Sequence, residues 1–387
     1  MKITGIKTLV CDAYRTNFIF VRIDTDEGIH GVGEATMSFG ENAAVGCIKD
    51  LEPAFLGQDP TAIDRLWHDN YRDSYWRGGP VLMSALAGLE MACWDIKGKA
   101  LNQPLWQLLG GKFRDRVPCY ANAWFVPAKT PAEFAAKAKE AAQAGWKALK
   151  WDPFGTAYRD VSNLEYRTAI ECVAAVREAV GPSIDLMIEG HGRFDLQSAM
   201  RIGQALAEYK VLWFEEPLFP ENFEALAELR RRIPVPIAAG ERIYTRYDAR
   251  RFLELGCAHF MQPDISRVGI REMTYMSAWA ETHSVAFCPH NPAGPITNAA
   301  TLQVAAAVPN FFLMETMATD VPWRKDITTE ELRMQDGAML VPDKPGLGID
   351  ICEDAIAAHP QKYYHLRHYR GDLTSIRPAN AAAWFKS

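Results

Sequence analysis

One regular interval between three glutamates constrains the fold of this chain more than any other feature of its sequence. Glu189, Glu215 and Glu241 lie 26 residues apart, and each follows a short apolar run. A buried strand, the helix after it and two short loops occupy about this length in a parallel α/β unit. The spacing therefore predicts three acids at the carboxyl ends of three successive parallel strands, where barrel active sites are built.

Carboxylates in this arrangement predict a metal site. Three negative groups that converge on one point repel each other unless a cation lies among them. Ligands that offer only oxygen favour Mg²⁺ or a similar hard ion. A single Asp or Glu after a strand is often no more than the cap of the next helix. Equal spacing, with polar partners at other strand ends, favours one Mg²⁺ bound by Glu189, Glu215 and Glu241.

Length, charge and cysteine content exclude several classes of protein. The chain has 387 residues, enough for two domains or for one large barrel with an elaboration. Its net charge of −6, without a basic cluster beyond a helix end, argues against a nucleic-acid partner. No stretch approaches the length of a membrane span, and the start is typical of a strand rather than a signal peptide. The eight cysteines form no C-x-x-C pair, so we expect reduced thiols in a cytoplasmic protein.

The sequence predicts an α+β domain over residues 1–117, a barrel over 118–345, and a tail over 346–387 that returns to the first domain. In the first part, apolar runs at 18–24 and 29–34 flank a glycine-containing turn and predict a hairpin. Helical patterns follow at 43–55, 61–74 and 81–99.

Strand and helix patterns alternate through the central part of the chain. The expected strand ends are Asn122, Lys150, Glu189, Glu215, Glu241, Asp264, His290 and Glu315. Most of these positions are 23 to 28 residues apart, and eight strands at this rhythm favour a modified TIM barrel over an open sheet. Residues two apart in a strand share a face, so the polar positions would point into the barrel mouth. Such pairs are Lys150 with Asp152, Glu189 with His191, Gln262 with Asp264, and Cys288 with His290.

An ordered set of motifs at these strand ends resembles the enolase superfamily, and within it the mandelate racemase branch. The motifs are Lys-Ala-Leu-Lys150-Trp-Asp, Glu189-Gly-His, Phe-Glu215-Glu-Pro, Gly-Glu241-Arg, Gln-Pro-Asp264, Pro-His290-Asn-Pro and Met-Glu315-Thr. The resemblance implies an α+β domain that caps a (β/α)7β barrel, one essential Mg²⁺, and abstraction of the proton next to a substrate carboxylate. Its members are commonly symmetric oligomers, so we expect a homo-oligomer.

The resemblance also implies roles for single residues. His290 would be the base, with Asp264 holding one ring nitrogen while the other faces the substrate. Glu315, if protonated, would donate a hydrogen bond to a substrate carboxylate, and Lys150 would contact the carboxylate or hydroxyls. A simpler structural alternative stays open, because a histidine beside a proline loop can be a satisfied surface residue and a glutamate can be an ordinary helix cap.

Two departures from the mandelate racemase pattern point to dehydration. Those racemases carry a second lysine as a base where this chain has Asp152, which disfavours a symmetric two-base racemase. The motif that contains His191 is instead similar to that of galactonate dehydratase and related acid-sugar dehydratases, in which this histidine protonates the departing 3-hydroxyl. Glu189 replaces the commoner Asp of its ligand position. His191 would then be the general acid, although a strand-end histidine can also simply bond a loop carbonyl.

The implied reaction is elimination of water from an aldonate of five or six carbons, such as galactonate, arabinonate, lyxonate or gluconate, to give a 2-keto-3-deoxy acid. The residues expected to contact this small-molecule substrate are Trp76, Arg77, Asn17, Asn122 and Asp152. Trp76 and Arg77 belong to a segment that resembles a lid over acid-sugar sites in these dehydratases. Asn17 belongs to a loop over residues 14–17.

Three other functions are weighed against dehydration. A cycloisomerase or epimerase of a sugar acid would use the same scaffold without expelling the 3-hydroxyl. A zinc hydrolase on a similar barrel needs several histidine ligands, typically His-x-His on the first barrel strand, and residues 119–124 contain none. A non-catalytic sugar-acid binding protein would bind without Mg²⁺-dependent turnover.

Overall fold

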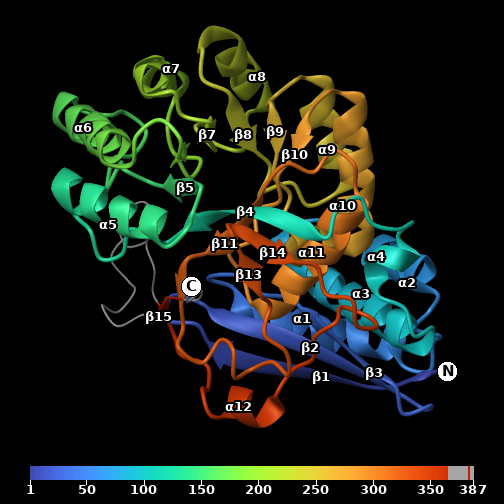
Figure 1. Cartoon of the computed structure of the whole chain (residues 1–387). Coiled ribbons are helices and arrows are strands. Elements are labelled where there is room, and N and C mark those ends of the chain that lie inside the picture. The colour runs from blue at the N-terminus through green and yellow to red at the C-terminus, as the bar shows by residue number, and fades with distance from the viewer. Residues whose placement is uncertain (365–381, 384–387) are drawn as a thin grey trace.

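An antiparallel sheet and its helices form the N-terminal part of the computed structural model, which describes residues 1–364 and 382–383 (Figure 1). The strands, in sheet order, are β1 (Ile3–Asp12), β2 (Asn17–Thr25) and β3 (His30–Glu34). The helices are α1 (Glu41–Phe55), α2 (Ile63–Asp73), α3 (Pro80–Ala100) and the short α4 (Leu105–Leu108). The predicted hairpin and the three predicted helices are confirmed, each within two residues at its ends.

Helix α3 lies directly on the sheet because glycines remove the side chains between them. A Cβ added at Gly33 of β3 would lie 2.0 Å from the carbonyl oxygen of Gly88 in α3. One added at Gly31 would lie 2.1 Å from the carbonyl oxygen of Ala92. Neither separation leaves room for a methyl group in a close-packed interior. The resulting contact buries most of α3 and fixes the end of β3 near the barrel.

Eight parallel strands alternate with seven helices in the second part of the described chain. The strands are β4 (Arg116–Asn122), β5 (Ala148–Trp151), β6 (Asp185–Glu189), β7 (Trp213–Glu215), β8 (Ile237–Ala239), β9 (Phe260–Met261), β10 (Ala286–Phe287) and β11 (Met314–Met317). The helices are α5 (Pro131–Gln143), α6 (Asn163–Val180), α7 (Leu196–Leu206), α8 (Phe223–Arg232), α9 (Arg246–Glu254), α10 (Ile265–Thr282) and α11 (Pro295–Ala307).

The strands pair in chain order from β4 to β10, and β11 pairs with β4. On the other side, the segment before β11 reaches β10, where the amide of Phe312 donates to the carbonyl of Phe287 at 2.9 Å. This is the predicted (β/α)7β order, in a TIM-barrel-like fold.

Alternation along the strands positions the polar residues, as predicted. Tyr120, Ala148, Met187, Trp213, Ala238 and Cys288 form one buried cluster of inward-facing side chains. Asn122, Lys150, Glu189, Glu215 and His290 each lie two residues beyond a member of this cluster. Because side chains two apart share a face, these polar groups lie above the cluster at the carboxyl ends of the strands.

Two buried glutamates of the N-terminal part hold it to the barrel. Glu34, at the end of β3, accepts hydrogen bonds from the amides of Gly294 (2.6 Å) and Thr297 (3.0 Å), at the start of α11. Glu90 of α3 accepts from the amide of Ile270 at 2.8 Å, where α10 restarts after a kink. Carboxylates at helix N-termini satisfy amides that lack partners within the helix. These contacts place the N-terminal part beside the carboxyl ends of the strands.

The chain after β11 returns to the N-terminal sheet. Its short elements are β12 (Thr319–Asp320), which pairs with β15 (Ala382–Ala383), the hairpin of β13 (Met334–Gln335) and β14 (Ala338–Leu340), and α12 (Glu353–Ala357). The amide of Asp12 in β1 donates to the carbonyl of His359 at 3.0 Å, and α12 packs on β1. Residues of the predicted tail up to 364 thus contact the N-terminal sheet, while 365–381 and 384–387 lie outside the described residues. The domain boundaries at 117 and 345 stay predictions.

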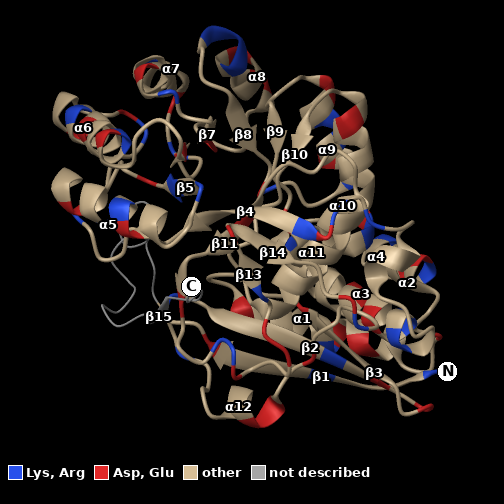
Figure 2. Cartoon of the chain, viewed as in Figure 1, with Lys and Arg blue, Asp and Glu red and all other residues tan. Residues whose placement is uncertain are grey.

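Charged residues of both signs are scattered over the outer helices α5 to α8 (Figure 2). Within the described residues, none of the helices combines the length and the apolar character that a membrane crossing requires.

Candidate active site

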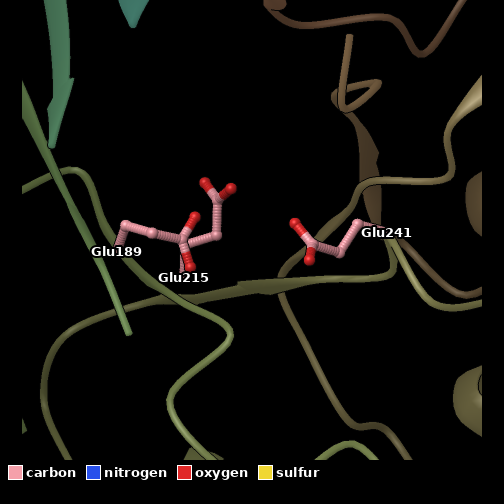
Figure 3. A group of neighbouring side chains, drawn as sticks. All are labelled: Glu189, Glu215 and Glu241. Carbon is pink, nitrogen blue, oxygen red and sulfur yellow. The ribbon is translucent and has the colours of Figure 1, made fainter. Parts of the chain in front are cut away.

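Three carboxylates meet at the ends of β6, β7 and β8. Glu189 and Glu215 are the last residues of β6 and β7 and face each other across the ladder. Each of the three acids, Glu241 included, offers an oxygen within 4.8 Å of the others' oxygens. Figure 3 shows the carboxylate of Glu241 directed towards the other two. The structure therefore brings the three predicted ligands together.

Glu241 reaches the site by an irregular path. It follows β8 after Gly240, whose φ is +137°, a conformation that is open to glycine and strained for other residues. A Cβ at Gly240 would also lie 2.8 Å from the amide nitrogen of Gln262. Because of this glycine, Glu241 turns inwards although it lies three residues beyond the inward-facing Ala238.

The donor set suits a hard divalent cation. The ligand atoms are carboxylate oxygens only, and the side chains of Glu189 and Glu215 are 2% and 1% exposed. Burial and then the charge of Glu189 raise the pKa of Glu215 well above its usual value. Burial raises the pKa of Glu241, but the positive charges of Arg242 and His290 outweigh burial and lower that pKa below its usual value. Positive charge among the three would relieve their repulsion, and oxygen ligands of this kind are those that Mg²⁺ takes.

Lys150 is the internal cation of this cluster. Its Nζ lies 3.3 Å from Glu189 Oε2 and 3.0 Å from Glu315 Oε1, and it also pairs with Glu215. Burial lowers the pKa of Lys150, but Glu215 and then Glu315 outweigh it and raise that pKa well above its usual value. The lysine is therefore charged, and it compensates part of the negative charge that strand alternation concentrates here.

Glu315 lies at the floor of the site and is fully buried. Asn122 Nδ2 donates to its Oε1 at 2.7 Å, and the amide of Asn291 donates to its Oε2 at 3.0 Å. Burial raises the pKa of Glu315, but Lys150 and then His290 outweigh it and lower that pKa. These surroundings favour the ionised form, and a hydrogen bond from a protonated Glu315 to the substrate stays a prediction.

His290 and Asp264 form the predicted pair. His290 Nδ1 lies 2.9 Å from Asp264 Oδ2, and Nε2 lies 3.3 Å from Glu241 Oε2. Burial lowers the pKa of His290, but Glu241, Glu315 and Asp264 raise it to about 9. Positive charge bound among the glutamates would lower this pKa again, because it would offset the effect of Glu241.

A second Asp–His pair lies beyond the ends of two paired strands, with Asp152 after β5 and His191 after β6. His191 Nδ1 lies 2.8 Å from Asp152 Oδ2, and the amide of His191 donates to Glu189 Oε1 at 2.7 Å. Arg193, which is fully buried, donates from one nitrogen to both oxygens of Asp152, at 2.5 and 2.6 Å. His191, the general acid expected from the sequence, is thus held by an aspartate, as is His290, the expected base.

A cavity of about 430 Å³ collects most of these groups between the barrel and the N-terminal part. The site residues expected from the sequence that line it are Asn122, Lys150, Glu189, His191, Glu241, Asp264 and His290. Arg15, Arg242 and Arg267 also line it. A cavity of this size, lined by basic and acidic side chains and two histidines, suits a small polar ligand.

Several residues expected to contact the substrate lie elsewhere. Trp76 is 82% exposed, and neither it nor Arg77 lines the cavity. Asn17 joins the β1–β2 loop to the tail, where its side chain bonds both the carbonyl and the amide of Lys362. Asp152 lies behind His191 and does not line the cavity. Substrate contact by these four residues stays a prediction that the present arrangement does not support.

Gln262, which the strand pattern places on the same face as Asp264, donates to Glu215 Oε2 at 2.9 Å. Two other side chains at the site, those of Arg15 and Arg193, were not expected from the sequence. Arg15 belongs to the same loop, residues 14–17, as Asn17. Of these two residues, Arg15 lines the cavity and Asn17 does not. Arg193 follows His191 in a turn beyond the end of β6, where strand parity does not apply, so no sequence signal marked it.

Two family models match this chain. The model of enolase C-terminal domain-like proteins matches residues 133–355, and that of the mandelate racemase / muconate lactonizing enzyme N-terminal domain matches residues 3–110.

Characterised relatives and a solved structure agree with these matches. The D-gluconate dehydratase of Thermoproteus tenax is 34% identical over 369 residues, covering 95% of this chain and 72% of that protein. The D-galactonate dehydratase of Pectobacterium atrosepticum is 36% identical over 366 residues, covering 92% of this chain and 94% of that protein. A crystal structure of an enolase superfamily member from Salmonella Typhimurium superposes with a TM-score of 0.89 at 30% identity, covering 93% of this chain and 98% of that one. The chain therefore belongs to the mandelate racemase / muconate lactonizing enzyme family of the enolase superfamily.

Proposed function

We propose that this protein is a Mg²⁺-dependent dehydratase of a sugar acid, which removes the proton next to the carboxylate and expels the 3-hydroxyl to give a 2-keto-3-deoxy acid. One observation carries the proposal. Two histidines, each held by an aspartate, line the same cavity as Glu189 and Glu241 of the carboxylate triad. Elimination of water needs one group that accepts a proton and another that supplies one. The dehydratase activity of the relatives named above agrees with this chemistry.

Glu189, Glu215 and Glu241 would hold the cation. When bound, it would supply positive charge to the substrate carboxylate and so stabilise the second negative charge that proton loss creates. Lys150 adds a fixed positive charge beside the triad. The carboxylate end of the substrate would therefore lie at this end of the cavity.

His290 would accept the proton from C2. Asp264 holds its Nδ1, so Nε2 is the nitrogen that serves as base. Glu315 on β11 and Glu241 after β8 favour the protonated ring once it has formed. The carboxylates around His290 thus stabilise the state that follows proton abstraction.

His191 would supply the proton for the departing hydroxyl. Hydroxide is a poor leaving group, so its departure as water needs a general acid. The C3–O bond breaks, the electron pair from the C2–H bond forms the C2–C3 double bond, and the proton from His191 completes the water. The enol product then tautomerises to the 2-keto-3-deoxy acid.

The test is incubation of the purified protein with Mg²⁺ and a library of aldonates and aldarates in D₂O, read by mass spectrometry. We expect one substrate to lose water and to gain one deuterium during tautomerisation. His290→Asn should lose both changes, and His191→Asn should lose at least the release of water. Deuterium uptake without loss of water in the wild type would instead assign an epimerase or cycloisomerase. Binding of an aldonate without either change would assign a non-catalytic binding protein.

A further inference from the structure

The two Asp–His pairs of the cavity differ in what lies behind the aspartate. Behind His290, Asp264 accepts from the amide and hydroxyl of Ser266 and begins α10 as its N-cap. Behind His191, Asp152 meets a guanidinium, that of Arg193. A fully buried arginine is unfavourable unless it is paired, so the position of this cation needs a reason.

Every hydrogen-bonding position of Asp152 that faces the protein is used. Oδ2 bonds His191 Nδ1 at 2.8 Å and Arg193 at 2.6 Å. Oδ1 accepts from Arg193 at 2.5 Å and from the amide of Phe154 at 2.8 Å. These contacts leave the carboxylate a single orientation, and that orientation fixes the plane of the His191 ring.

Arg193 is itself held from several sides. Its Nη1 donates to the carbonyl of Gly155 at 3.1 Å. The guanidinium lies 5.9 Å from the ring centre of Phe154 and 5.4 Å from that of Phe194. Aromatic faces and a fixed carbonyl restrict where a guanidinium can point. The arginine is therefore a rigid support for Asp152 and not a mobile surface charge.

The backbone of His191 shows why such support is needed. Its φ is +52°, in the left-handed region that a non-glycine residue occupies only when its surroundings impose it. Its amide is tied to the ligand Glu189 at 2.7 Å, and Arg242 donates to its carbonyl at 3.3 Å. The main chain is thus held from the metal side, and the ring is held from the side of Asp152.

We propose that Asp152 and Arg193 are a positioning pair for His191, which fixes its imidazole so that it protonates the departing hydroxyl. The inference rests on the proposed dehydratase function and deepens it. Neither residue lines the cavity, so both act through His191. With Nδ1 directed at Asp152, the proton given to the leaving group comes from Nε2. The step forms one O–H bond, breaks the C3–O bond and releases water.

The decisive variant is Asp152→Asn. The amide oxygen would take the place of Oδ1, where Arg193 and the amide of Phe154 both donate, and the bond from Arg193 to the Oδ2 position would be lost. The amide NH₂ would then face His191 Nδ1 and exclude a proton from it. The ring could then no longer be an imidazolium. We expect the rate of water loss from the aldonate identified above to fall by about 100-fold or more, the range of a lost general acid.

A change of leaving group separates positioning from a general loss of activity. Fluoride leaves without a proton, so a 3-fluoro-3-deoxy aldonate needs the base but not the acid. Here the C2–H proton goes to His290, the C3–F bond breaks and fluoride is released. Asp152→Asn and His191→Asn should release fluoride within roughly threefold of the wild-type rate, and both should still exchange the C2 proton for deuterium. His290→Asn should lose both reactions.

Arg193→Lys and Glu272→Gln complete the set. Arg193→Lys keeps the charge but not the fork, so it should lose water elimination in part and keep fluoride release. If Asp152→Asn fails to fold, Arg193→Lys still tests whether the pair positions His191. Glu272→Gln is the control. It weakens the ion pair between the buried Glu272 of α10 and Arg246 of α9, and neither residue lines the cavity. This variant should change neither water elimination nor fluoride release.

Equal losses of water and fluoride elimination in folded Asp152→Asn and Arg193→Lys would overturn the inference, because the pair would then support the whole site. Unchanged water elimination in both would overturn it as well. A wild type that dehydrates no sugar acid would instead refute the proposed function. The two failures are therefore distinguishable.

Discussion

At the scale of single residues, the two histidines of the cavity share a chemistry but not an environment. His290 lies near three carboxylates, those of Asp264, Glu241 and Glu315. The ring of His191 bonds the carboxylate of Asp152, which also pairs with the buried Arg193. The first setting favours a histidine that gains a proton. A base reaches that state when it abstracts a proton from the substrate.

Arg15 should recognise the substrate. Its side chain lines the cavity, and no hydrogen bond or ion pair ties its guanidinium to any other residue in the described part of the chain. A charge-assisted hydrogen bond from such a group contributes about 1.5–3 kcal/mol to binding. We expect Arg15→Met to raise KM by about 10-fold or more and to change kcat less, as measured by steady-state kinetics.

The control is Arg65→Met, which removes an arginine that is 78% exposed on α2. It should leave both constants at wild-type values. A fall in kcat at unchanged KM in Arg15→Met would show that the residue acts on the chemical step and not on binding.

At the scale of elements, the loop between β8 and α9 decides where Glu241 points. Gly240→Ala would place a methyl group 2.8 Å from the amide of Gln262, at a φ of +137°. Such strain typically costs about 1–3 kcal/mol. We expect weaker binding of Mg²⁺, by about 10-fold, in isothermal titration calorimetry, because Glu241 would no longer face the other two ligands.

Gly57→Ala is the matched control. Gly57 also has a positive φ, of +76°, but nothing lies within 4 Å of an added Cβ. This variant should lose stability through backbone strain alone and bind Mg²⁺ as the wild type does. If Gly240→Ala binds Mg²⁺ equally well, the turn does not position the ligand.

The contact between α3 and α10 should make stability depend on pH. Burial raises the pKa of Glu90 from 4.5 to about 7, against the hydrogen bonds from the amides of Arg271 and Ile270. The folded state therefore binds this proton more tightly than the unfolded state. The stabilisation is complete below pH 4.5 and is lost as pH rises through 7, by about 3 kcal/mol in total.

Glu90→Gln removes this titration. Urea unfolding at a series of pH values should show a smaller fall in unfolding free energy between pH 4.5 and 7 for the variant than for the wild type. Parallel pH profiles would show that Glu90 titrates in the folded protein as it does in the unfolded chain.

The elements themselves follow from local pattern. The period of the apolar runs predicts the strands, and the parity within each strand predicts which polar residue faces the mouth of the barrel. Cap residues such as Thr130 and Ser162, each with a glutamate three residues on, mark the starts of α5 and α6. Glu241 is the exception to parity, because Gly240 turns the chain before it.

At the scale of the whole molecule, the protein should stay folded without its metal. Lys150 pairs with three of the carboxylates of the cluster, so their repulsion is partly compensated when no cation is bound. We expect a chelator to abolish turnover while the circular dichroism spectrum stays unchanged. Lys150→Met should have a lower Tm than the chelated wild type, because loss of one partner of a buried ion pair costs about 3–5 kcal/mol.

Mg²⁺ should raise the Tm of Lys150→Met more than it raises that of the wild type, because it would replace the missing charge. Differential scanning calorimetry with and without Mg²⁺ measures both shifts. Equal shifts would show that Lys150 does not compensate the metal ligands.

Local sequence patterns were sufficient to predict the order of the elements and the strand ends at which the acids stand. Both depend on periods that repeat along the chain, and the physics of a strand or a helix is local. The contacts that these side chains make could be read only from the folded chain. Lys150 meets Glu315, Asp152 meets Arg193, and Arg15 reaches the cavity while Trp76 does not. Such contacts depend on how sheet twist and loop paths bring distant segments together, and no local period encodes that.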